Sequence, residues 1–318
     1  MKTPIIPLDR WIAASLLQKA IRRNHPTHAM RAAHCLLEMA PAYLVRRLGV
    51  IVVEDIGPAN LPLVQAYLDH VPELMAYPRL TLPWVERMCG SLKSRLLCDL
   101  SFVAATHPTA KQQAFEYGFM PTSTLLECLT YEPDLLTRAV LLRCLSFKDV
   151  CAWVEQRHGP TMADTLRRAR RLGTENMELG LPLVTGEQPT HIVTMSLPPP
   201  DLLHGIPTYA LEQHTRLGLR AYRQFLNHLP DINLPHRVKL HVVGEILFAL
   251  ESGLLDRESI FTSHENLKPL VWESFTPQGH DASHMAAWIE MVQARLPLLA
   301  KCKRQVFTPH NLSLSEPK

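Results

Sequence analysis

Apolar residues recur at helical spacing along most of this chain, and prolines interrupt the pattern at short intervals. The first stripe consists of Trp11, Ile12, Leu16, Leu17, Ala20 and Ile21. Positions i, i+3, i+4 and i+7 share one face of an α-helix, so the stripe indicates a helix that packs by one side. Proline ends a helix because it lacks the N–H donor and its ring clashes with the preceding turn. With 26 prolines in 318 residues, the sequence predicts an all-α fold, a compact array of antiparallel helix pairs.

One long segment departs from this pattern. Glycine, proline and threonine accumulate over 172–207, where no helical stripe persists, and this composition is typical of an irregular loop or linker. Inside it, the segment HIVTMSL (191–197) has the composition of one short strand. We therefore expect a helical domain over 1–171, the Pro/Gly-rich loop, a second helical subdomain over 208–307, and a frayed tail over 308–318.

Composition places loose limits on function. Apolar residues make up 47% of the chain and charged residues 20%, and the formal net charge of +3 does not by itself predict nucleic acid binding. The seven cysteines form no CxxC pair and mostly lie among leucines, which favours buried thiols in a reducing compartment. No apolar run approaches the roughly 18 residues of a membrane span, and the N-terminus lacks the apolar core of a signal peptide. We expect a cytoplasmic protein with no membrane partner.

The commonest catalytic motifs do not occur in the sequence. It contains no GxxxxGK[ST], no GxGxxG that opens a helix, no GxSxG and no HExxH. These motifs form phosphate-binding loops, the tight turn that carries a nucleophilic serine, and pairs of zinc-binding histidines on a helix. The sequence therefore favours a protein that is not an enzyme, and it predicts no cofactor.

The stretch RRLGVIVVEDIG (46–57) combines two arginines, an apolar run and two acids on one expected helix. Glu54 and Asp55 lie seven to nine positions beyond the arginines, and helical ion pairs need i,i+3 or i,i+4 spacing. One interpretation gives the acids a partner on another helix, Arg22 or Arg23, or on a neighbouring subunit. The alternative is a solvated helix end that Gly57 caps.

Residues 16–57, LLQKAIRRNHPTHAMRAAHCLLEMAPAYLVRRLGVIVVEDIG, resemble the C-terminal helical region of the replication-associated recombination ATPases. This clamp-loader-like AAA+ group includes the Werner-helicase-interacting ATPases. Its pattern is a basic "AI-R" element, a Pro-containing turn with an Ala/Leu-rich helix, and a helix that ends in "SEDIG". The matching residues are Ala20, Ile21, Arg22, Pro26, Ala29, Arg46, Arg47, Leu48, Glu54, Asp55, Ile56 and Gly57.

In that family the region is α-helical and drives homotetramer assembly, while the ATPase motifs lie in an upstream part with no counterpart in these 318 residues. The resemblance thus implies self-association, and it does not imply ATPase activity. The assembly candidates are Arg22, Arg46, Arg47, Glu54 and Asp55. The chain departs from the family where Val53 replaces the usual serine and where Pro58-Ala59-Asn60 replaces Leu-Ala-Asp, so the contacts at the helix end are expected to differ.

A basic cluster follows in TLRRARRLG, where Arg167, Arg168, Arg170 and Arg171 lie within five positions. On a helix these side chains form a broad guanidinium surface, which suits a nucleic acid backbone or an acidic partner. The alternative is a solvated face. The segment GTENMELGLP that follows carries two glutamates, which could neutralise part of the cluster.

A second polar group lies in GIPTYALEQHTRLG (205–218), which contains Tyr209, Glu212, His214 and Arg216. The simplest interpretation is an i,i+4 ion pair between Glu212 and Arg216 on a helix, as part of a polar packing seam. The alternative is a catalytic site in which His214 is the acid or base and Arg216 binds an anion.

The segment GHDASHMAAW places His280 and His284 at i,i+4, a spacing that zinc pairs use. Asp281 and Ser283 also fit the N-terminal cap of a helix, and the sequence fixes no third ligand. We therefore predict capping and no metal site.

The leading hypothesis is a non-enzymatic assembly or adaptor protein linked to DNA replication or recombination. It would act as a homo-oligomer that binds a protein of the replication machinery, with DNA contact at the basic cluster. One alternative is a small helical enzyme that acts on a phosphorylated or nucleic acid substrate through Tyr209, Glu212, His214 and Arg216. Another is an accessory factor of a mobile element or phage that engages a host replication protein.

Overall fold

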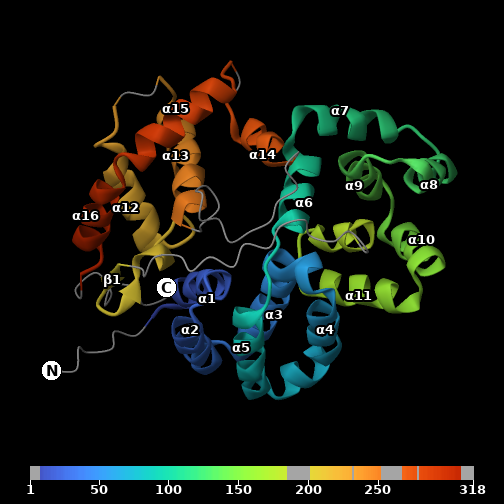
Figure 1. Ribbon diagram of the computed structural model, residues 1–318, viewed down its shortest axis with the longest axis horizontal. Coiled ribbons are helices and arrows are strands. Elements are labelled where there is room, and N and C mark those ends of the chain that lie inside the picture. Colours follow the sequence, from blue (N-terminus) through green and yellow to red (C-terminus); the bar gives the residue numbers. More distant parts are fainter. Residues whose placement is uncertain (1–7, 185–200, 231–232, 252–266, 278, 309–318) are drawn as a thin grey trace.

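The computed structural model describes residues 8–184, 201–230, 233–251, 267–277 and 279–308. Within these ranges the chain forms sixteen α-helices and a single two-stranded sheet, so the predicted all-α class is confirmed (Figure 1). None of the helices in the described ranges combines the length and the apolar character that a membrane-spanning segment needs.

The first helices form the lower part of the molecule in Figure 1. They are α1 (Arg10–Arg22), α2 (Pro26–Met39), α3 (Pro41–Ile51), α4 (Leu61–Ala76) and α5 (Leu82–Gly90), with the short turns η1 (Val52–Ile56), η2 (Gly57–Asn60) and η3 (Pro78–Thr81). The Asp9 carboxylate caps α1 by accepting from the N–H groups of Trp11 and Ile12, and prolines begin α2 and α3. The first N–H groups of a helix have no partner within the helix. A capping carboxylate accepts from them, and proline has no N–H to leave unpaired.

The next helices extend away from this group on one side (Figure 1). They are α6 (Leu96–Thr106), α7 (Pro108–Tyr117), α8 (Thr122–Tyr131), α9 (Leu135–Cys144), α10 (Phe147–His158) and α11 (Pro160–Arg171). Helix α11 packs on α4 and α10, and α9 packs on α6 and α7. The chain then forms η4 (Met177–Leu183), which contacts α6, α9 and α11.

The C-terminal part lies on the opposite side. It contains β1 (Leu202–Leu203), β2 (Ile206–Pro207), η5 (Thr208–Ala210), α12 (Arg216–Leu226), α13 (His236–Glu251), α14 (Leu267–Phe275), α15 (Ala282–Gln293) and α16 (Leu296–Val306). The strands are antiparallel and pair Leu202 with Pro207 and Leu203 with Ile206. Helix α12 packs on α16. The C-terminal part contacts the rest of the chain through α14, which packs on α6, and through η5, which packs on α1.

The described residues of the expected loop over 172–207 include a short helical turn, η4, and a two-stranded hairpin. Every residue of η4 is buried, because its apolar side chains fill the space between α6, α9 and α11. The hairpin of β1 and β2 begins at Leu202, whereas the strand expected in HIVTMSL lies outside the described residues, as does the tail after Thr308.

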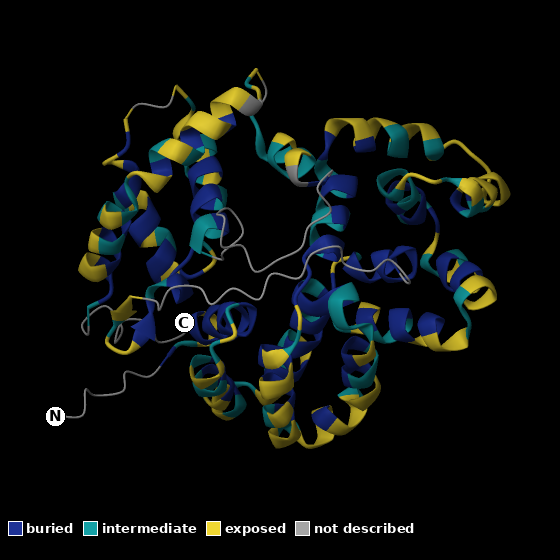
Figure 2. Ribbon diagram, in the orientation of Figure 1, coloured by how far each residue is buried: buried dark blue, intermediate teal, exposed yellow. Residues whose placement is uncertain are grey.

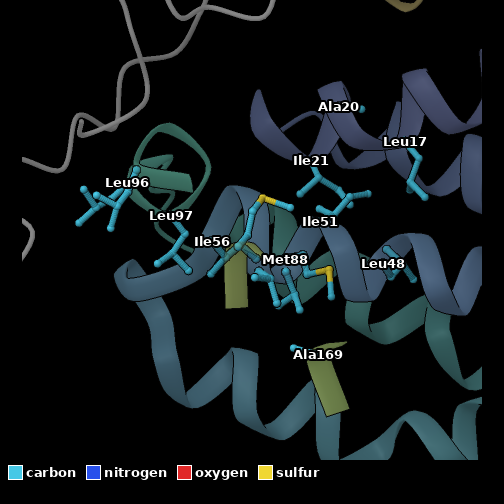
Figure 3. Close-up of a cluster of buried hydrophobic side chains, with 14 of the residues drawn as sticks. Leu17, Ala20, Ile21, Leu48, Ile51, Ile56, Met88, Leu96, Leu97 and Ala169 are labelled. Atoms are coloured by element: carbon cyan, nitrogen blue, oxygen red, sulfur yellow. The ribbon is translucent and has the colours of Figure 1, made fainter. Parts of the chain in front are cut away.

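The hydrophobic core is one connected cluster that includes residues from both predicted helical domains. Figure 3 shows part of it, where α1, α3, α5 and α11 meet the turn η1 and the start of α6. The labelled side chains there are Leu17, Ala20, Ile21, Leu48, Ile51, Ile56, Met88, Leu96, Leu97 and Ala169. Figure 2 shows the corresponding pattern, with buried residues on the inner sides of the helices and exposed residues on the outer sides.

Candidate functional site

A buried group of charges joins α1, η1 and the start of α6. The Nη2 of Arg22 lies 2.9 Å from Oε1 of Glu54, and its Nε donates to Oδ1 of Asp55 at 2.6 Å. Arg95 binds the same two carboxylates, at 3.2 Å from Oδ1 of Asp55. The predicted inter-helix ion pair of Arg22 is therefore present, within one chain.

This ion network has the properties of a structural element. Burial alone would raise the pKa of Glu54, but the guanidinium groups of Arg95 and Arg22 lower it to about 2. Arg95 has a raised pKa because its thiol and carboxylate neighbours outweigh its own burial. Glu54 and Arg95 are therefore both charged at neutral pH, and neither exchanges a proton in the usual range of general acid–base catalysis.

The ion network also determines which residues of the predicted assembly set are accessible to a second subunit. Arg22, Glu54 and Asp55 contact residues of their own chain, and half-buried Arg47 donates to the side-chain oxygen of Gln18. Arg46 is the member of the set that the structure leaves exposed. Four members of the assembly set, Arg22, Arg47, Glu54 and Asp55, therefore hold α1 against α3 and η1. Arg46 is the member left exposed to a second subunit.

Sequence analysis missed Arg95 and its neighbour Lys93. The Nζ of Lys93 donates to the carbonyls of Met88 at 2.8 Å and Cys89 at 2.9 Å, and so satisfies the end of α5. Two cations in the apolar segment SLKSRLL, just after a helix end, were the available signal. Buried lysine and arginine residues need partners.

The helix predicted to contain both Glu212 and Arg216 begins later than expected. Helix α12 begins at Arg216, and Thr215 caps it through a 3.1 Å bond from the Gly218 N–H to its Oγ1. Glu212 precedes the helix in a turn, so it cannot form an intrahelical i,i+4 pair with Arg216. A Cβ on Gly218 would lie 2.1 Å from the Glu212 carbonyl oxygen, so glycine is required where this turn crosses α12.

Glu212 instead binds His214 and faces Lys19. Its Oε2 accepts from the His214 backbone N–H at 3.0 Å and lies 2.6 Å from the ring Nδ1. Burial would raise the pKa of Glu212, but the ammonium of Lys19 and the bonds from His214 lower it to about 2. Burial lowers the pKa of Lys19 to about 7, against the opposing effect of Glu212 and Glu251. His214 and Glu212 therefore form a histidine–carboxylate pair, and the buried amine of Lys19 lies on the inner side of Glu212.

A cavity of about 600 Å³ lies between α6, α13 and α14. His214 lines it, whereas Tyr209 and Glu212 are buried behind the turn and Arg216 is exposed on α12. Tyr209 lies against His25, with the phenol oxygen 3.2 Å from Nδ1. The four residues of the predicted catalytic set are thus not all brought to one cavity.

The basic cluster of 167–171 is largely neutralised. Arg167 binds Glu155 at 3.0 Å and Asp164 at 2.7 Å, and Arg168 binds Asp69. Arg170 binds Glu178 at 3.1 Å, as the glutamates that follow the cluster indicated. Arg171 remains exposed. Most of the charge of this surface is therefore balanced by carboxylates of the same chain.

His280 and His284 lie at a helix start, where capping is observed. Asp281 accepts from the backbone N–H groups of Ser283 and His284, and the His284 ring approaches the Asp281 N–H to complete a capping box. The two histidine rings are 5.0 Å apart. Within the described ranges no three His, Cys, Asp or Glu residues converge as a metal site would require.

Helices α12 and α16 form a basic surface that sequence analysis did not identify. They pack side by side and contain no aspartate or glutamate. Their exposed cations are Arg216, Arg220, Arg223, Lys301 and Arg304. No carboxylate of the described residues forms an ion pair with any of the five. The signal in the sequence was the absence of acids from two helices that lie 70 residues apart, which only the fold brings together.

The chain matches no family model, no curated protein and no solved structure.

Proposed function

We propose that the protein is a non-enzymatic helical adaptor, linked to DNA replication or recombination, that binds the DNA backbone through α12 and α16. The observation that carries this proposal is the basic surface of Arg216, Arg220, Arg223, Lys301 and Arg304. The link to replication or recombination rests on the resemblance over 16–57.

The arrangement of the three arginines on α12 suits a row of phosphates. Arg216, Arg220 and Arg223 follow i, i+4 and i+7 spacing, so they lie along one face. A guanidinium binds phosphate through two parallel N–H bonds. Arg216 is also the first residue of α12, where a cation is unfavourable because the N-terminus of a helix carries partial positive charge. Helix stability therefore does not account for it.

Two variants that each lose three positive charges can be compared in their affinity for DNA. The triple variant Arg216→Gln/Arg220→Gln/Arg223→Gln removes three cations that have no carboxylate partner among the described residues. The triple variant Arg167→Gln/Arg168→Gln/Arg171→Gln removes three cations from the largely neutralised cluster. We expect the first to weaken binding of labelled DNA at least about tenfold and to reduce the slope of log K against log salt by about 3. The second is expected to change affinity by no more than about twofold, because its partners already balance most of its charge.

Fluorescence anisotropy over roughly 50–200 mM salt measures both quantities. Far-UV circular dichroism checks that each variant is folded. A wild type that binds no DNA, or equal losses in the two variants, would contradict the proposed surface.

We also propose self-association through an exposed apolar patch that consists of Phe115 on α7 and Phe119 in the turn between α7 and α8. Phe115 and Phe119 are 65% and 76% exposed, and their rings lie 5.0 Å apart. Figure 2 shows that both helices are largely exposed. Apolar patches of this kind mark protein contacts.

The second copy would present its basic surface to this patch. Glu116, next to Phe115 in the sequence, has an exposed carboxylate, and Glu127 on α8 and Asp134 at the start of α9 are also exposed. These acids complement the cations of α12 and α16. Such a contact joins two different surfaces, so copies add head to tail. It also makes DNA and a second copy competitors for the same cations.

Size exclusion with light scattering tests this contact. We expect a wild-type oligomer that DNA dissociates, and that Phe115→Ser/Phe119→Ser converts into folded monomers. Met75→Ser/Leu80→Ser changes two exposed apolar residues elsewhere and should leave the oligomer intact. A monomeric wild type would rule out self-association and leave the DNA measurement unaffected.

A second candidate function, an enzyme that acts on a phosphorylated or nucleic acid substrate, is favoured by one observation. His214 lines the cavity and is held by Glu212 at 2.6 Å, which is how a carboxylate orients a general base. Cleavage of labelled DNA by the wild type that His214→Ala abolishes would favour this function over the adaptor.

A further inference from the structure

The cavity between α6, α13 and α14 is independent of the basic surface and has its own chemistry. Its volume of about 600 Å³ lies in the range of small-molecule sites, which are concave and mostly apolar with a few polar groups. Helix α6 comes from the first part of the chain and α13 and α14 from the second, so folding of the whole chain is needed to form it.

Aromatic rings make up much of the cavity wall. Phe102 of α6 stacks on Phe275 of α14, with centroids 4.5 Å apart and planes inclined by 24°. Trp272 lies 6.0 Å from Phe275, and Phe248 of α13 lines the same cavity. The faces of such rings carry negative charge density and attract cations, tryptophan most strongly.

Phe248 already shows this preference within the protein. The Nζ of Lys19 lies 5.1 Å from its ring centroid and the guanidinium carbon of Arg22 lies 5.7 Å away. These cations belong to the buried groups behind the cavity. No such cation lies over Trp272, Phe275 or Phe102 among the described residues. Phe102 and Phe275 cover one face of each other by stacking, so the ring of Trp272 and the uncovered faces of the two phenylalanines are left for a ligand.

The charged groups of the lining favour a cation. Two carboxylates, Asp99 and Glu245, line the cavity with the guanidinium of Arg95 and the imidazoles of His214 and His241. The buried Glu212 carboxylate binds His214 and offsets its charge. Arg95 is bound to Glu54 and Asp55, which offset its charge. Glu245 accepts from the neutral amide of Gln213 at 2.8 Å and lies 4.0 Å from the His241 ring.

We propose that this cavity binds a small organic ammonium compound, with the cationic head against Trp272 and Phe275 and its charge balanced by Glu245. The remaining volume accommodates the organic part of the ligand against Phe102. A quaternary or tertiary ammonium suits this site better than a metal ion, since the rings provide polarisable faces and few ligating atoms.

Choline and its neutral isostere 3,3-dimethylbutan-1-ol, which replaces nitrogen by carbon, test the proposal in isothermal titration calorimetry with the full chain. We expect choline to bind at least about tenfold more tightly than the alcohol. Glu245→Gln is expected to weaken choline binding at least about fivefold and to leave the alcohol unchanged. Trp272→Leu is expected to remove choline binding.

Glu273→Gln is the matched control. Glu273 lies on α14, next to the cavity residues Trp272 and Ser274. Its carboxylate binds His107 at 3.1 Å and does not line the cavity. Its substitution removes an equal charge and should not alter choline affinity. No binding of choline up to about 10 mM, equal affinity for the alcohol, or equal effects of Glu245→Gln and Glu273→Gln would overturn the proposal.

Discussion

The Nε of Arg22 donates to Oδ1 of Asp55 at 2.6 Å, and the two side chains are 1% and 0% exposed. They come from α1 and η1, and Arg95 at the start of α6 binds the same carboxylate oxygen. Removal of one member from a buried pair leaves an uncompensated charge in the interior. The pair therefore fixes how three segments of the chain meet.

Asp55→Asn is expected to destabilise the protein by about 3–5 kcal/mol, because Arg22 and Arg95 would share one carboxylate, that of Glu54. Urea unfolding followed by circular dichroism measures the change. Asp69→Asn is the control, because Asp69 and its partner Arg168 have side chains 52% and 39% exposed, and its expected effect is below about 1 kcal/mol. Similar losses in both variants would show that the buried network does not set stability.

Gly218→Ala is expected to cost about 1–3 kcal/mol, because the new Cβ would lie 2.1–2.6 Å from backbone atoms of Glu212. Backbone cannot rotate away as a side chain can, so the turn that carries His214 must shift. Gly90→Ala is the matched control, since a Cβ there meets nothing within 4 Å, and it is expected to be neutral or slightly stabilising at the end of a helix. An unchanged urea midpoint for Gly218→Ala would contradict the crossing of turn and helix.

Arg46→Glu is expected to leave stability within about 0.5 kcal/mol of the wild type, because the side chain is exposed. Arg47→Glu is expected to cost more, since Arg47 donates to Gln18 and lies near Glu54. If the resemblance over 16–57 extends to assembly, Arg46→Glu also lowers the oligomer mass in light scattering. A stable variant with unchanged mass would locate self-association away from α3.

The helices could be predicted because their information is local. Apolar spacing and helix-breaking prolines identified α1, α2 and α3, and Pro26 and Pro41 begin the second and third of these. The short helical turn η4 was not predicted, because its burial comes from contacts with three distant helices, which composition does not reveal.

The site residues were harder to predict for the same reason. Arg22 was named as a partner for Glu54 and Asp55, but Arg95, which lies 40 positions after Asp55, was not. The turn at Glu212 was mistaken for helix because its neighbours have helical spacing, while the 3₁₀ turn and the crossing at Gly218 depend on packing. The cavity combines three helices from both parts of the chain, so no single segment indicates it.

His214 is expected to contribute stability that depends on pH. Its pKa is raised above 6.5, mainly because its ring N–H donates to Glu212 and despite its partial burial. A raised folded-state pKa means that the contribution is fully present below pH 6.5, the ordinary value, and is lost as the pH rises through the folded-state value. The advantage of the wild type over His214→Gln should be below about 1 kcal/mol near pH 6, since the side chain is 69% exposed, and should vanish once the pH is well above the folded-state pKa. Proton NMR of the His214 ring measures the pKa directly. In Glu212→Gln the pKa should fall because the charged acceptor is lost, and a wild-type pKa at or below 6.5 would show that the 2.6 Å contact between His214 and Glu212 does not hold the ring protonated.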